Sequence, residues 1–98
     1  MKRNFKVALK DFKGNELKDE KGNIQMMSDF VGIKLYALGG NQQASPELKM
    51  RAYQLMKRMQ QGAEHLELET EDAQLIKDIA KESCIAGIYG QVVETLEG

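Results

Sequence analysis

The chain has 98 residues, of which 42% are hydrophobic and 30% are charged. These values are typical of a folded globular protein of one domain, and they argue against general disorder and a second core. The apolar runs are far shorter than the roughly 20 residues of a membrane-spanning helix, and no signal peptide is visible, so we expect a cytoplasmic protein without a membrane segment.

The charges are divided unevenly along the chain. Residues 1–62 carry twelve Lys or Arg and six Asp or Glu, whereas residues 63–98 carry two and nine. The formal net charge of −1 therefore combines halves of about +6 and −7. Such polarity favours folding of the chain on itself, head-to-tail assembly of copies, or different partners for a basic and an acidic face.

Residues 1–27 are expected to form strands joined by tight turns. Phe5, Val7 and Leu9 alternate with Lys or Ala, which is the pattern of a half-buried strand. Lys-Gly-Asn then occurs twice, eight residues apart, and both Gly and Asn tolerate the positive φ angles of hairpin turns. We therefore expect two successive turns around a short edge strand centred on Leu17.

Residues 28–38 are expected to form the first helix, capped by Ser28 and ended by the glycine pair at 39–40. Its apolar side chains point almost all round, which predicts a central helix that packs on several sides. A strand over residues 29–38 stays an alternative, because the run is short and Gly32 is a poor helix former.

Short signals mark the next elements. Ser-Pro-Glu at 45–47 predicts the start of a second helix, which Gly62 can end. Residues 66–69 alternate in polarity and predict a short strand that pairs with the strand at Phe5. Thr70 is then expected to cap a third helix.

The last third of the chain contains a change of helical phase. In an unbroken helix, the apolar face of residues 75–80 would not continue into Ile85 and Ile88. A break between residues 83 and 87 restores one apolar stripe from Ile85 to Leu96. The sequence therefore predicts two helices in this region.

Together these elements predict an α+β fold, in a single domain over residues 1–98. We expect a small antiparallel N-terminal sheet or hairpin from residues 1–27. It packs with three to four helices from residues 28–98, a mainly helical part that includes the short strand at 66–69.

No catalytic, metal or nucleotide motif stands out in the sequence. The acidic residues between 64 and 72 are interpreted as a solvated face, and His65 has no second His or Cys at metal-ligand spacing. Cys84 is interpreted as a small buried hydrophobe, although a spatial pairing with His65 stays open. We therefore expect no catalytic residue, cofactor or metal, and a protein that is not an enzyme.

The second predicted helix carries two candidate surfaces. One of them has apolar side chains away from the core stripe and lysines beside them, which suits docking to a protein partner or self-association. Arg51 and Arg58 share one edge of the helix and, with the basic N-terminal half, favour nucleic-acid binding as the alternative. The candidate docking residues are Lys49, Met50, Tyr53 and Lys57.

Both ends of the chain resemble small uncharacterised proteins encoded by bacteriophages and prophages. The likeness lies in KVALKDFKGNEL at 6–17, in LETEDAQLIK at 68–77 and in Gly90-Gln91. The resemblance implies a non-enzymatic accessory protein that acts through contacts with phage or host proteins. It supplies no functional residues.

Overall fold

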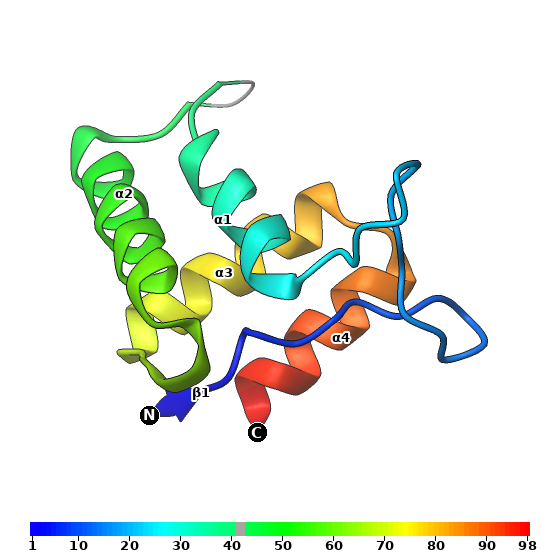
Figure 1. The fold of residues 1–98 in the computed structure, drawn as a ribbon. Helices are drawn as coiled ribbons and strands as arrows, with labels where there is room; N and C mark the ends of the chain where they lie inside the picture. The colour runs from blue at the N-terminus through cyan, green and yellow to red at the C-terminus, as the bar shows by residue number, and fades with distance from the viewer. Residues whose placement is uncertain (41–42) are drawn as a thin grey trace.

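The computed structural model describes residues 1–40 and 43–98, and within them four helices surround one hydrophobic core (Figure 1). Strand β1 pairs antiparallel with β2, and the predicted α+β fold is confirmed. The elements in chain order are β1 (Lys2–Arg3), α1 (Met27–Tyr36), α2 (Pro46–Gln61), the 3-10 helix η1 (Ala63–His65), β2 (Leu66–Glu67), α3 (Thr70–Ser83) and α4 (Ala86–Glu97).

The small sheet joins the N-terminus to the segment between α2 and α3, and β1 lies earlier in the chain than the predicted strand at Phe5. Lys2 stands opposite Glu67 and Arg3 opposite Leu66. Phe5 is not in this ladder, because its amide donates to the Ala63 carbonyl of η1 at 2.8 Å. β2 accordingly ends at Glu67 rather than at residue 69.

Residues 4–26 form a closed ring of backbone hydrogen bonds instead of continuous strands. The amide of Leu17 donates to the carbonyl of Leu9, that of Gln25 to Leu17, and that of Leu9 to Gln25, at 2.8, 2.9 and 2.9 Å. The three positions are eight residues apart, which is the spacing of the repeated Lys-Gly-Asn. The expected strand at Leu17 is thus only an isolated bridge on either side of that residue.

Helix α1 confirms the helical reading of residues 29–38, but the cap predicted at Ser28 is wrong. The helix begins at Met27, and its N-cap residue makes no side-chain cap. The first amides are satisfied by tertiary contacts instead, since Met27 donates to the Val7 carbonyl at 2.8 Å and Ser28 to the Phe5 carbonyl at 2.9 Å. The N-terminal segment therefore caps this helix.

Helix α1 contacts both α2 and α3, as the expectation of packing on several sides requires, but one side of it is exposed. Ile33 and Tyr36 are 68% and 77% exposed. The helix packs mainly against α2, where Gly32 lies so close to Gln60 that an added Cβ would stand 3.2 Å from its Nε2. One face is covered, with Met27, Val31 and Leu35 as its buried apolar residues.

The starts of α2 and α3 follow local sequence signals, but the N-cap of α3 lies one residue earlier than predicted. The Ser45 hydroxyl accepts from the Leu48 amide at 3.1 Å, which confirms the predicted cap. Thr70 is the first residue of α3 rather than its cap, because Glu69 holds the N-cap position. The Asp72 carboxylate accepts from the Glu69 amide at 3.1 Å and closes this end.

The predicted break in the last third is confirmed. α3 ends at Ser83, α4 begins at Ala86, and Cys84 and Ile85 between them are extended. Ile85 does not belong to the apolar stripe, since it is the N-cap residue of α4 and is 76% exposed. The stripe starts one turn later and buries Ile88, Val92 and Leu96.

Candidate functional site

Met50, Tyr53 and Lys57 lie on the outer side of α2 and are called the α2 face below. Met50 is 54% and Tyr53 48% exposed, outside the buried stripe of the helix. The Lys57 ammonium stands 5.3 Å from the centre of the Tyr53 ring, within the range of a cation–π contact. The surface therefore combines accessible apolar area with positive charge.

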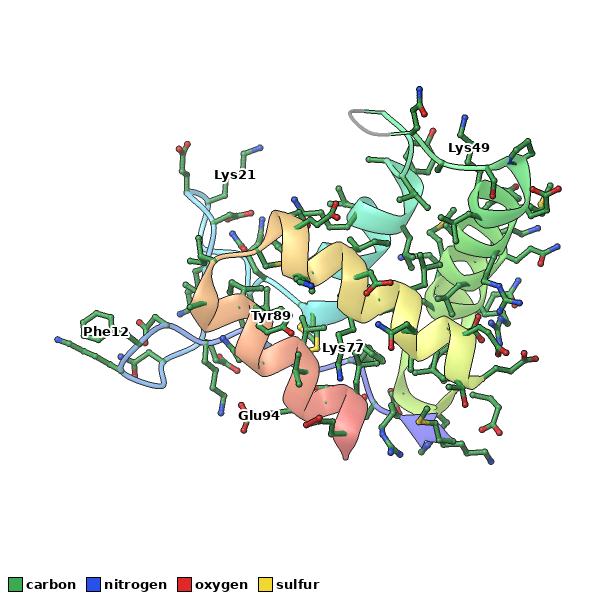
Figure 2. All side chains as sticks on the ribbon, turned by 180° about the vertical axis from the view of Figure 1, so that it is seen from behind. Phe12, Lys21, Lys49, Lys77, Tyr89 and Glu94 are labelled. Atoms are coloured by element: carbon green, nitrogen blue, oxygen red, sulfur yellow. The ribbon has the colours of Figure 1, made fainter. Side chains whose placement is uncertain are left out.

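The fourth candidate residue, Lys49, points to a different place. Its aliphatic chain packs against the turn that follows α1, because a Cβ at Gly39 would stand 2.8 Å from Lys49 Cε. Figure 2 shows this side chain beside the segment that joins α1 to α2. Lys49 thus borders the turn after α1, whereas Met50 lies on the opposite edge of the α2 face.

Helix α1 also carries an exposed aromatic residue, Tyr36. Gly32 lies near Gln60 and Gly39 near Lys49, so α1 and α2 run antiparallel along their contact. Tyr36, one turn after Gly32, is 77% exposed. The sequence did not predict this exposure, because the apolar residues of α1 suggested burial on several sides.

The two arginines of the nucleic-acid alternative hold a buried carboxylate. Arg51 Nη1 lies 3.0 Å from Asp72 Oδ1, and Arg58 Nη2 lies 3.0 Å from Asp72 Oδ2. Asp72 is only 2% exposed. Arg58 also donates to the Glu67 carbonyl at 3.0 Å, so the pair fixes the start of α3 against α2.

The charge state of Asp72 follows from these contacts. Burial opposes ionisation, but the Glu69 amide and the guanidinium groups of Arg58 and Arg51 outweigh it and hold the pKa of Asp72 below its ordinary value of 3.8. The carboxylate is therefore ionised near neutral pH. The sequence showed Arg51 and Arg58 on one edge of a helix, but not the acid that they share.

Part of the charge polarity is used inside the molecule. Several ion pairs join the basic first part of the chain to the acidic last part. Those on the surface contribute little to stability, whereas the pairs with buried Asp72 fix tertiary structure. They are the Met1 ammonium with Glu67 at 3.5 Å, Lys6 with Glu64 at 3.2 Å, and both arginines with Asp72.

The remaining candidates for chemistry are not brought together. Cys84 is a free, half-buried thiol packed against the core, and His65 is exposed in η1. Among residues 1–40 and 43–98, no group of three His, Cys, Asp or Glu side chains is arranged to hold a metal ion.

Two findings concern the chain as a whole. Comparison with known families, curated proteins and solved structures found no match. In the part of the chain that the structure describes, no helix has both the length and the apolar character needed to cross a bilayer. Inference about function therefore rests on the surface of the molecule itself.

Proposed function

We propose that this protein is a non-enzymatic interaction or assembly protein of the cytoplasm, which docks to a protein partner through the α2 face. The observation that carries the proposal is the exposure of Met50 and Tyr53 beside Lys57, on a helix whose opposite side supplies the core. The resemblance of the chain ends to phage proteins supports an accessory role of this kind.

The composition of the α2 face indicates the chemistry of the partner. Met adapts its shape to irregular surfaces, and Tyr is enriched at protein interfaces. Lys57 and the half-exposed guanidinium groups of Arg51 and Arg58 give the surroundings a positive charge. The face therefore suits a partner with an apolar centre and an acidic margin, whose approach the charges would orient.

Nucleic-acid binding finds less support as the function. Arg51 and Arg58 each direct a hydrogen bond to Asp72, which occupies donors that phosphate contacts would require. Releasing them would leave a buried carboxylate without its counter-ions.

Differential capture from cells that express the protein tests the proposal. The native chain is compared with the variant Met50→Asp plus Tyr53→Ala, which is expected to keep its fold because neither side chain is in the core. Ile85→Ser is the matched control, since Ile85 is an exposed apolar residue on another element.

A partner that binds the native chain and the Ile85→Ser control, but not the double variant, is the expected result. Circular dichroism and thermal unfolding establish that the double variant is folded. Equal capture by all three proteins, or capture by none, would contradict docking through the α2 face. Tight, salt-sensitive binding to DNA or RNA that Arg51→Ala plus Arg58→Ala abolishes would favour the nucleic-acid alternative.

A further inference from the structure

The two turns of the N-terminal segment are built on the same scaffold. In the first, Asp11 Oδ1 accepts from the amides of Lys13 and Asn15, at 2.9 Å each. In the second, Asp19 Oδ1 accepts in the same way from Lys21 and Asn23, again at 2.9 Å each. The glycines have matching φ angles of +87° at Gly14 and +84° at Gly22.

The turns differ in the residue that follows the aspartate. The first carries Phe12 and the second carries Glu20. Because Glu is accommodated in the same backbone geometry, the scaffold does not require an aromatic ring at this position. Phe12 is 95% exposed, and Figure 2 shows it pointing away from the body of the molecule, so the core does not require it either.

The first turn is nevertheless held firmly in place. The Gln91 side chain accepts from the Lys10 amide at 2.8 Å and donates to the Lys10 carbonyl at 2.9 Å. The Gln91 Nε2 group also donates to the Gly87 carbonyl at 3.0 Å. Gln91 belongs to α4, so its bonds to Lys10 tie the base of the turn to that helix. An exposed aromatic residue on a fixed backbone is a favourable binding anchor, because little backbone freedom is lost when its ring is buried.

A groove between α1, α2 and α3 offers a complementary surface. It has a volume of about 850 Å³, and its apolar lining residues come from the turn after α1, from α2 and from α3, including Leu38, Leu48 and Ile79. Acidic side chains line it along α3, among them Asp78 and Glu82.

The basic residues at the same groove, Lys34 and Arg51, lie on its α1 and α2 sides and not along α3. Lys34 stands 5.3 Å from the centre of the Phe30 ring, and Arg51 is paired with Asp72. The acidic margin of the groove along α3 therefore favours a basic ligand with an apolar tip.

We propose that Phe12 of one copy inserts into this groove of a second copy. Lys10 and Lys13 flank Phe12 and would face the acidic margin on α3, so the two surfaces match in both apolar character and charge. The Lys13 ammonium lies 5.7 Å from the Phe12 ring centre, which keeps a positive charge at the tip.

This contact joins two different surfaces, so it is heterologous and assembles copies head to tail. Each bound copy still presents a free turn at one end and a free groove at the other. The contact is small, so we expect a dissociation constant in the micromolar to millimolar range. The mean mass of the assemblies should therefore grow with protein concentration. The contact involves neither Met50 nor Tyr53 and thus goes beyond docking through the α2 face; either proposal can fail without the other.

Two variants each disable one side of the contact. Phe12→Glu copies the second turn into the first, so its fold is expected to be unchanged. Asp78→Lys plus Glu82→Lys reverses the acidic margin on exposed positions near the C-terminal end of α3, where positive charge suits the helix dipole. Glu20→Ala, in the other turn, is the matched control.

Sedimentation equilibrium on the full chain decides the matter. We expect growing assemblies for the native chain and the Glu20→Ala control, and at least roughly tenfold weaker association for each disabled variant. Mixing the two disabled variants should restore a complex that stops at one copy of each, because one intact turn and one intact groove remain.

Three results would overturn the proposal. They are a native chain that stays monomeric at millimolar concentration, a Phe12→Glu variant that associates as the native chain does, and a mixture that forms no heterodimer. Normal circular dichroism spectra and unfolding midpoints of both disabled variants show that lost association does not reflect lost folding.

Discussion

Replacing Asp72 by Ala tests the tertiary contact that joins α2 to α3. The change removes the shared acceptor of Arg51 and Arg58 and the acceptor of the Glu69 amide. Loss of the capping bond costs about 1 kcal/mol, and charge-assisted hydrogen bonds contribute about 1.5–3 kcal/mol. The arginine side chains are 40% and 45% exposed, so water can hydrate them once Asp72 is removed. This hydration offsets much of the stability lost with the charge-assisted hydrogen bonds.

The net expected loss from Asp72→Ala is about 2 kcal/mol of unfolding free energy, below the 3–5 kcal/mol of a fully buried broken pair. For a domain of this size it lowers the midpoint of thermal unfolding by roughly 8–16 °C. Urea unfolding followed by circular dichroism measures the loss. Glu71→Ala, at an exposed position in the same turn, is the control and should change stability little.

The pH dependence of the same comparison provides a second test. The pKa of Asp72 is lowered in the folded protein, so its ionised form stabilises the fold at pH values above its unfolded pKa. This contribution is lost as the pH falls through the folded pKa. The stability difference between the native protein and Asp72→Ala should thus be full near pH 7 and shrink below about pH 4. A loss under about 0.5 kcal/mol at pH 7, or a difference that grows in acid, would refute the assigned role of Asp72.

Three further predictions concern α4 and the encounter with a partner. Ile88→Asp places a charge at a position that is 8% exposed and should lower the unfolding free energy by about 3 kcal/mol or more; an unchanged urea midpoint would mean that this face is not buried. Ile85→Ser supplies the side-chain cap that α4 lacks and should raise stability by about 1 kcal/mol, whereas destabilisation would show that Ile85 is packed. Added salt should slow association with the captured partner more than it speeds dissociation, as surface plasmon resonance can measure, and a salt-independent association rate would exclude electrostatic steering.

Local signals predicted those parts of the fold that local contacts determine. The Ser45 cap, the positive φ angles of Gly14 and Gly22, and the break after Ser83 each depend on residues close in sequence. The start of α1 could not be found in this way. Its first amides donate to the carbonyls of Phe5 and Val7, which lie twenty or more residues earlier.

The candidate site shows the same contrast between local features, which the sequence predicts, and tertiary contacts, which it does not. Helical periodicity placed Met50 and Tyr53 outside the core, and both are about half exposed. It could not pair Arg51 with Asp72, because that contact depends on how α3 packs against α2. The only sequence signal for Phe12 is that two Asp-Xaa-Lys-Gly-Asn turns differ in carrying Phe in one and Glu in the other.

Photo-crosslinking from the α2 face tests the central claim most directly. A photoreactive amino acid replaces Met50 in one version of the chain and Ile85 in another, and both are expressed in cells at equal levels before irradiation. Docking through the α2 face predicts a defined crosslinked partner from position 50 that position 85 does not give, and that Tyr53→Ala weakens. No crosslink from position 50, or the same products from both positions, would contradict it.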